Sequence, residues 1–430
     1  EGEHKRTYVA YMDDDFYARV TYYDHEKKQW RRFAELVDHC IAPNDRKDGH
    51  NVPNLFLTDD GTIHLFYGSH GHRYKYARSK NPEDIDHWET GMRVGEHATY
   101  PYLRQTKGGR LLLFYRYGPE GGYDHPFLGL QYSDDNGESW SDIKKLATFP
   151  TGCKISRAAY DPVHNRVHLL LRIPDQPRWR VYHCMYAADS GKLLGLNGSV
   201  LGPLATQEDF REKNALVARG LASLCIHDGR PYVLFRDAEK GMCFGYPDGE
   251  NLVKRAVPDG TFEGLAGTPS LYTADGETFR VYAVCDRKEE DASPSLVEMD
   301  GKLYRRSYYH GMKIYYRPSK PPTQSGGDIM AWTTTDRGKS WDSGTYLLER
   351  GQVGHTLDEV NVVMDYPGHG PFLITNEPTG SWPQNLKPTG GWAGRKKDPA
   401  LYRQVHYDNP ARGGERLYAL DREGNIVEGE

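Results

Sequence analysis

Four residues, arranged as two pairs along the chain, have the chemistry to move a proton beside a negative charge. His50 lies in DGHNVPNL, and His70 lies in FYGSHGH, twenty residues further on. Tyr100 lies in ATYPYL and Arg116 in LLFYRYG. Histidine titrates near neutral pH and tyrosine can transfer a proton, whereas arginine stays charged and binds a carboxylate through two hydrogen bonds. The set predicts proton-transfer chemistry on an anionic substrate.

No member of this set is diagnostic by itself. The chain has 18 histidines, and a single loop histidine is ordinary. Arg116 is more informative, because it interrupts the apolar run LLLFY, where a charged side chain needs a partner. Four further residues near these positions are candidates for contacting the substrate: Asn51, His72, Tyr117 and Tyr160.

Each pair flanks a predicted β-hairpin, and similar hairpins recur along the chain. The repeated unit is a turn followed by an apolar and aromatic strand, as in GTIHLFYG, GRLLLFYRY, NRVHLLLRI, GRPYVLFRD and ETFRVYAVCD. The unit returns about every 50 to 60 residues, with an insertion around 286–325. Four antiparallel strands repeated radially are typical of a β-propeller.

The sequence therefore predicts one all-β domain over residues 1–430, a seven-bladed β-propeller with six blades as the alternative. The terminal segments YVAYMDDDFYARVTYYDHEKKQW and RLYALDREGNIVEG are expected to close the ring as a shared blade. In a propeller, the start of the first strand and the end of the second strand of every blade lie on one rim. Both pairs fall at such positions, so we expect them to meet at a central pocket.

Two turns share the pattern Ser/Thr-x-Asp-x-Gly-x-Ser-Trp, SDDNGESW at 133–140 and TTDRGKSW at 334–341. In this turn, called an Asp-box, the Asp and Ser or Thr side chains bond backbone amides, and glycine permits the tight bend. The tryptophan packs into the neighbouring strands. We therefore assign Asp134, Asp135 and Asp336 to structure and look for the chemistry elsewhere.

The bulk composition argues against two classes of partner. The formal net charge is −5 with charges mixed along the chain, so no basic stripe indicates nucleic acid. The chain has no apolar run of about 18 residues, so no membrane span is expected. The six cysteines form no CxxC motif and lie mostly in strand-like segments, which favours buried free thiols.

The segment DGHNVPNLFLTDDGTIHLFYGSHGHRYKYARSKNPEDIDHW, followed by TYPYL and LLLFYR, resembles the ulvan lyases of polysaccharide lyase families 24 and 25. The resemblance covers roughly residues 40–380 and is densest over 48–117. It implies a seven-bladed propeller that cleaves ulvan by β-elimination. Ulvan is a sulfated polysaccharide of rhamnose 3-sulfate and uronic acids.

The resemblance also implies roles for the rim residues. His50 and His70 match the paired catalytic histidines, Tyr100 matches the catalytic tyrosine, and Arg116 matches the arginine that neutralises the uronate carboxylate. Tyr160 matches a further pocket tyrosine. We expect His50 and Tyr100 to transfer protons while His70 orients the uronate, with Tyr100 as base the alternative. This route needs no cofactor for catalysis.

A structural metal is a further implication of the resemblance. Cys225 and His227 lie two residues apart on one face of a predicted strand, and Cys243 and Cys285 come from the following strands. Together they could form a tetrahedral zinc site. Buried thiols and a turn histidine are the alternative interpretation.

Several expectations about substrate and location follow from the resemblance. The partner would be a sulfated anionic polysaccharide, which a secreted or periplasmic monomer would meet outside the cytoplasm. Four cations could bind sulfate, and none is assigned that role: Arg73, Lys75, Lys154 and Arg236.

Three other functions stay open. They are a lyase on another uronate polymer, a non-catalytic carbohydrate-binding propeller and a sialidase-like glycoside hydrolase. The tripeptide Arg172-Ile173-Pro174 occurs in sialidases, but it precedes their Asp-boxes, whereas here it follows the first one.

Overall fold

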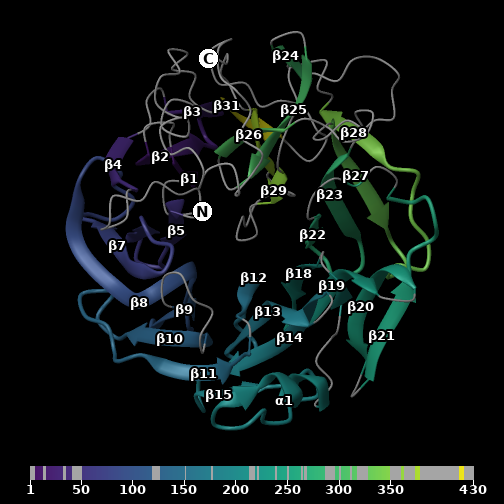
Figure 1. Ribbon diagram of the computed structural model, residues 1–430, viewed down its shortest axis with the longest axis horizontal. Coiled ribbons are helices and arrows are strands. Elements are labelled where there is room, and N and C mark those ends of the chain that lie inside the picture. The colour runs from purple at the N-terminus through teal and green to yellow at the C-terminus, as the bar shows by residue number, and fades with distance from the viewer. Residues whose placement is uncertain are drawn as a thin grey trace.

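The molecule is built from β-sheets that stand side by side around a central axis (Figure 1). The computed structural model describes residues 5–12, 16–31, 35–40, 51–118, 126–150, 152–175, 178–212, 218–219, 222–237, 240–248, 251–262, 265, 269–285, 296–299, 302–309, 312–316, 328–348, 360–362, 373–377 and 416–420. In this part of the chain, α-helix is limited to α1 (Gln207–Glu212). No helix there has both the length and the apolar character needed to span a bilayer.

The first sheet comes from the N-terminal region and is antiparallel. It contains β1 (Arg6–Met12), β2 (Tyr17–Asp24), β3 (Gln29–Trp30) and β4 (Glu35–His39). The strand order is β1-β2-β3, and β4 also pairs with β2.

A continuous eight-stranded sheet follows, in the order β16-β11-β10-β9-β8-β7-β6-β5. Its strands are β5 (Asn54–Leu57), β6 (Ile63–Tyr67), β7 (His72–Ser79), β8 (Trp88–Gln105), β9 (Leu111–Tyr117), β10 (Phe127–Ser133), β11 (Lys144–Thr148) and β16 (Ala205–Thr206). The first half of β8 pairs with β7 and the second half pairs with β9. This strand therefore ends one four-stranded unit and begins the next.

Three more sheets continue the ring (Figure 1). The first contains β12 (Lys154–Asp161), β13 (Arg166–Asp175), β14 (Arg178–Ala187), β15 (Lys192–Leu194) and β17 (Ala218–Arg219). The second contains β18 (Ala222–His227), β19 (Arg230–Asp237), β20 (Gly241–Asp248) and β21 (Asn251–Ala256). The third contains β22 (Ser270–Thr273), β23 (Phe279–Cys285), β27 (Asp328–Thr334) and β28 (Thr345–Leu348).

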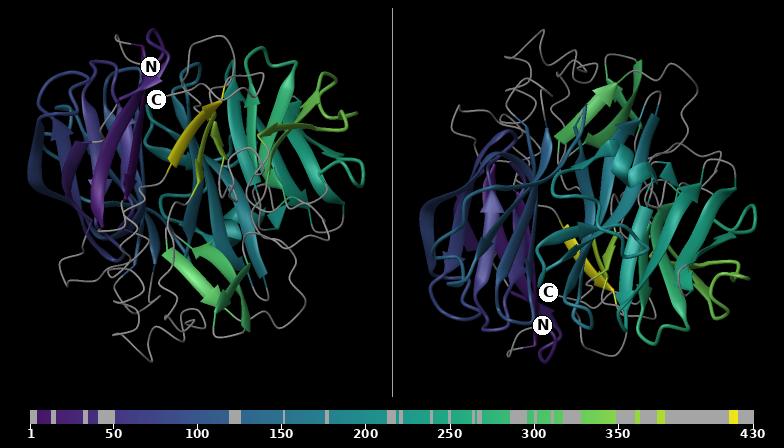
Figure 2. Two further views of the ribbon diagram at one scale, coloured as in Figure 1. Left: turned by 90° about the horizontal axis from the view of Figure 1, so that it is seen from above. Right: turned by 90° about the horizontal axis from the view of Figure 1, so that it is seen from below.

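Between β23 and β27 the chain forms a separate three-stranded sheet of β24 (Leu296–Met299), β25 (Lys302–Tyr309) and β26 (Met312–Tyr316). Figure 2 shows this sheet, in green, to one side of the layer formed by the other sheets. It falls within the predicted insertion.

The described strands of the two chain ends lie in different sheets. β1 to β4 form one sheet, while β31 (Arg416–Leu420) pairs with β30 (Leu373–Glu377), which pairs with β29 (Val360–Val362). The closing of the ring by a blade shared between the terminal segments stays a prediction. The all-β propeller prediction is confirmed, and the count of seven blades stays a prediction.

Neighbouring sheets pack face to face through apolar side chains. Ala18 and Val20 of β2 lie against Ile63, Leu65 and Tyr67 of β6, and all five are buried. Complete burial of a large apolar side chain contributes about 1.5–3 kcal/mol, so such interfaces carry much of the stability. All six cysteines are free and buried, which confirms the interpretation as thiols within the core.

Candidate active site

Tyr100 occupies an irregular position in β8, at the point where this strand passes from one four-stranded unit to the next. The pairing of β8 with β9 shifts between Thr99 and Tyr102, which marks a β-bulge. Tyr100 has a φ of 59°, in the left-handed region that is uncommon for residues other than glycine. Bulges redirect side chains and are frequent beside active sites.

Arg116 lies directly opposite this bulge, near the end of β9, where it pairs with Thr99. Its guanidinium carbon is 5.1 Å from the centre of the Tyr100 ring, and its Nη2 donates a hydrogen bond of 3.2 Å to the Thr99 hydroxyl. The side chain is buried, with 8% of its surface exposed. Within the described residues it forms no ion pair with a carboxylate, and its Nε has no hydrogen-bond partner.

A second cation reaches the same aromatic ring from the next sheet. The Lys154 Nζ lies 5.2 Å from the centre of the Tyr100 ring. Lys154 begins β12 and pairs there with Arg172 of β13. Burial, together with the positive charges of Arg116 and Arg172, lowers the pKa of Lys154 to about 8.

His70 lies in the turn between β6 and β7 at the same end of the sheet. The next residue, Gly71, donates its N–H to the Thr99 hydroxyl over 3.1 Å, and this hydroxyl also accepts the Arg116 hydrogen bond. The carbonyl of Asn51 accepts the N–H of Gly68 in the same turn. Thr99 therefore connects the His70 turn to Arg116, and Asn51 is held beside them.

The remaining site predictions fall in different places. His50 lies outside the described residues. His72 begins β7, opposite Ala98, and is half-buried. The Tyr117 ring stacks on the Phe127 ring, with 4.1 Å between the ring centres. Successive residues of a strand point to opposite faces of the sheet, so Tyr117 points away from the face that Arg116 occupies.

Tyr160 is not brought together with these residues. It lies near the far end of β12 from Lys154, where its hydroxyl accepts the Lys107 N–H at 2.6 Å and donates to Asn165 at 2.7 Å. The prediction that Tyr160 joins this pocket is therefore corrected. A strand of this length spans the sheet, so a residue near its end reaches the opposite edge.

The predicted zinc site is also corrected. Cys225 and Cys285 belong to one core cluster, whereas Cys243 belongs to another. The His227 ring covers Gly276, where an added Cβ would lie 2.6 Å from the ring. The described residues contain no group of three or more histidine, cysteine, aspartate or glutamate side chains that could hold a metal ion. These thiols pack as apolar groups in two different core clusters.

Sequence reasoning did not single out Thr99, and it named Lys154 only as one of four cations that could bind sulfate. Thr99 carries no sequence signal, because its role depends on the bulge. Lys154 starts the first strand of its sheet, so the rule that selected Tyr100 would also have selected it. Of the four unassigned cations, Arg73 pairs with Glu96 at 2.7 Å and Lys75 pairs with Asp38 at 3.4 Å.

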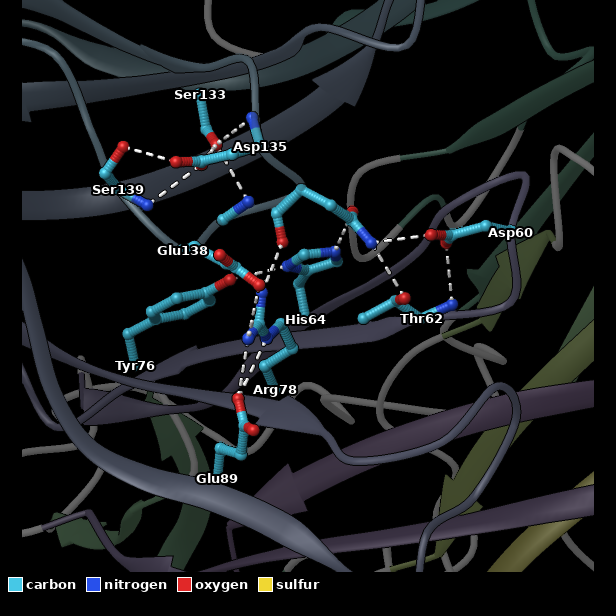
Figure 3. Close-up of polar contacts among 12 residues, drawn as sticks. Asp60, Thr62, His64, Tyr76, Arg78, Glu89, Ser133, Asp135, Glu138 and Ser139 are labelled. Carbon is cyan, nitrogen blue, oxygen red and sulfur yellow. Dashed lines mark hydrogen bonds and ion pairs between the residues drawn. The ribbon is translucent and has the colours of Figure 1, made fainter.

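The Asp-box lies at the opposite end of these strands and has the structural role predicted for it (Figure 3). Asp135 accepts hydrogen bonds from the Ser133 hydroxyl and from both the N–H and hydroxyl of Ser139. Asn136 reaches the preceding unit, where it bonds Asp60 at 2.6 Å and His64 at 3.2 Å. In the second Asp-box, Asp336 accepts the same bonds from Thr334 and Ser340.

Comparison with known proteins adds a sequence relationship. A family described as a BNR repeat-containing family member matches residues 6–166. The ulvan lyase of Nonlabens ulvanivorans is 32% identical over 158 residues, which cover 32% of each chain. An ulvan lyase of family PL25 from Pseudoalteromonas sp. (strain PLSV) is 30% identical over 137 residues, 27% of this chain and 28% of its own. The chain thus matches about a third of the length of these curated relatives.

Comparison with solved structures adds a relationship in fold. A PL25 ulvan lyase bound to -[GlcA(1-4)Rha3S]- superposes with a TM-score of 0.58 at 16% sequence identity, covering 87% of both chains. A second structure of a PL25 ulvan lyase gives a TM-score of 0.59 with the same coverage. The chain is therefore similar to ulvan lyases in sequence over about a third of its length, and it shares their fold over most of it.

Proposed function

We propose that this protein is a polysaccharide lyase that cleaves ulvan by β-elimination at the uronate of the rhamnose 3-sulfate–uronate linkage. Support comes from the two curated relatives described above, both named ulvan lyases, and from the fold shared with a PL25 ulvan lyase. The observation that carries the proposal is the contact of Tyr100 with both Arg116 and Lys154. A phenol beside two cations suits proton transfer next to a carboxylate.

In the proposed reaction, Arg116 binds the uronate carboxylate and stabilises the negative charge that develops as the C5 proton leaves. The electron pair of the C5–H bond forms the C4–C5 double bond, and the C4–O bond breaks. Tyr100 and His50 transfer the two protons, one from C5 and one to the leaving oxygen, while His70 orients the uronate. Either Tyr100 or His50 can serve as the base.

The buried state of Arg116 supports this assignment. A charged group that is largely out of water and has no carboxylate partner in the described chain interacts strongly with an incoming anion. The Thr99 hydroxyl fixes the guanidinium, and Nε has no hydrogen-bond partner among the residues that the structure describes. A uronate carboxylate would supply the missing counter-charge.

The proposal also includes the finer architecture and the setting of the enzyme. We infer seven blades, because the described strands form six sheets besides the separate β24–β26 sheet, and the longest of these contains two four-stranded units joined by β8. The enzyme would act as a monomer outside the cytoplasm, since a polysaccharide cannot cross a membrane. Catalysis would use Arg116 for neutralisation and no metal.

The test is to mix the protein with ulvan and follow the ultraviolet absorbance of the unsaturated uronate. Elimination creates this chromophore, and hydrolysis does not. Arg116→Ala and Tyr100→Phe, checked for unchanged melting temperature, should lose the signal. A signal only with another uronate polymer would retain the chemistry and reject the substrate. Release of sugar without the chromophore, or sugar binding without any cleavage, would reject the lyase function.

A further inference from the structure

The two cations that contact the Tyr100 ring differ in one respect, because one of them can lose its charge near neutral pH. Arginine stays protonated in proteins, so Arg116 and Arg172 keep their charges. Burial and these two arginines lower the pKa of Lys154 to about 8. The charge of the cluster therefore falls by one as the pH rises through about 8.

Two other cations near this end of the sheets are paired with carboxylates. Arg73 pairs with Glu96, and Lys75 pairs with Asp38. The charges of Arg116 and Arg172 both act on Lys154 and lower its pKa. Bringing like charges together opposes folding, and such arrangements concentrate at functional sites, where a ligand supplies the opposite charge.

We propose that Lys154 is a second uronate-binding cation, which holds the substrate carboxylate together with Arg116 beside the Tyr100 ring. This inference rests on the proposed function, because it adds a residue to the same site. The two cationic groups lie 5.1 Å and 5.2 Å from the centre of one ring, although they come from different sheets. A carboxylate has two oxygens and can accept hydrogen bonds from both groups.

Uronate binding at this site should be coupled to proton uptake by Lys154. A bound carboxylate favours the charged form of Lys154, so binding above about pH 8 takes up a proton. Arginine at this position stays charged over the same range. The affinity of wild type for uronate should therefore fall above about pH 8, and that of Lys154→Arg should not. Lys154→Met should bind uronate weakly at every pH.

The experiment measures how fast Lys154 is acylated by a small amine-reactive reagent, read by mass spectrometry of its peptide. The probe is D-glucuronate, which has no substituent on O4 to eliminate. Glucuronate should slow labelling of Lys154 at least threefold and leave the exposed Lys80 unchanged. Lys154→Met should raise the KM for the proposed substrate, ulvan, about tenfold, the size expected for one charge-assisted hydrogen bond.

Each outcome decides between the two proposals. Equal labelling of Lys154 with and without glucuronate overturns the second-cation proposal, even if ulvan is cleaved. If Lys154 is labelled in neither sample, the variants decide, and a Lys154→Met protein with unchanged KM and pH dependence overturns it. Protection of Lys154 in a preparation that does not cleave ulvan supports the anion site and rejects the lyase function.

Discussion

The two ends of β9 and β10 make opposite use of charge. At the Asp-box end, charges are paired, since Arg110 contacts Asp134 at 2.6 Å and Arg78 contacts Glu89 at 2.7 Å. At the other end, Arg116 and Lys154 both face the Tyr100 ring, and the charge of Arg116 contributes to the lowered pKa of Lys154. Paired opposite charges stabilise a turn, whereas clustered positive charges favour the binding of an anion.

The same contrast appears in the backbone. At the Asp-box end, the left-handed residues are Asn136, with a φ of 53°, and Gly137, with a φ of 83°, and both residue types adopt this region readily. At the other end, Tyr100 has a φ of 59°, which is uncommon for a bulky aromatic residue, and its ring contacts Arg116. Strain in a residue other than glycine is a frequent mark of a functional position. The predictions below test this division of roles.

Arg116→Ala should have the largest effect on activity. Loss of a group that stabilises developing charge typically reduces kcat about 10²–10³-fold. Arg116→Lys should restore a small part, because lysine lacks the two-pronged geometry. The measurement is kcat and KM by unsaturated-product absorbance. An Arg116→Ala enzyme with near-normal kcat would contradict the assignment of the Tyr100 end of the strands to catalysis.

Gly137→Ala should have the largest effect on stability. An added Cβ would lie 2.0 Å from the Tyr76 hydroxyl, and the left-handed φ opposes alanine. Such strain costs about 1–3 kcal/mol from the backbone alone, before the clash is counted. Gly108→Ala is the matched control, since nothing lies within 4 Å of its Cβ position. Thermal unfolding reports the difference, and activity per folded molecule should stay unchanged.

The pH dependence of kcat/KM should show a decline above about pH 8 in the wild type. Burial, Arg116 and Arg172 lower the pKa of Lys154 to that value, and the free enzyme loses this charge as the pH rises through it. In Lys154→Arg the decline should move to higher pH. A decline at the same pH in Lys154→Arg would assign it to another group.

Lys154→Met should raise the melting temperature at pH 7. A pKa of about 8, below the ordinary value of 10.5, means that the folded state disfavours the charged lysine. This cost is fully present below pH 8 and disappears as the pH rises through 10.5, so the gain should shrink over that range. A variant that is less stable at pH 7 would contradict the picture of gathered like charges.

Asp135→Asn should have the smallest effect on stability, and it should lower the melting temperature where Lys154→Met raises it. Hydrogen bonds from Ser139 and Ser133 lower the pKa of Asp135 to about 2, from an ordinary value of 3.8. The carboxylate therefore stabilises the fold above about pH 4, and this contribution is lost as the pH falls toward 2. Melting curves of wild type and Asp135→Asn should differ at pH 6 and converge near pH 2.

The fold and part of the site could be predicted from the chain alone. The turn-and-strand repeat indicates the propeller, and the position of a residue in its hairpin predicts that His70, Tyr100 and Arg116 lie at one end. The same reasoning placed Tyr160 at this end wrongly, because it did not fix where along β12 the residue falls. The zinc prediction was wrong because spacing along strands does not decide which face packs against which sheet.

The sequence by itself determined the Asp-box turns, because every bond that shapes Asp135 comes from residues within four positions of it. Only the tertiary structure decided the cation cluster. Tyr100, Arg116 and Lys154 belong to three strands, and they meet because β8 bulges as it passes between two units. Hydrogen bonds within a turn depend on residues that are close in sequence, whereas a site formed by residues of different sheets depends on how the sheets pack.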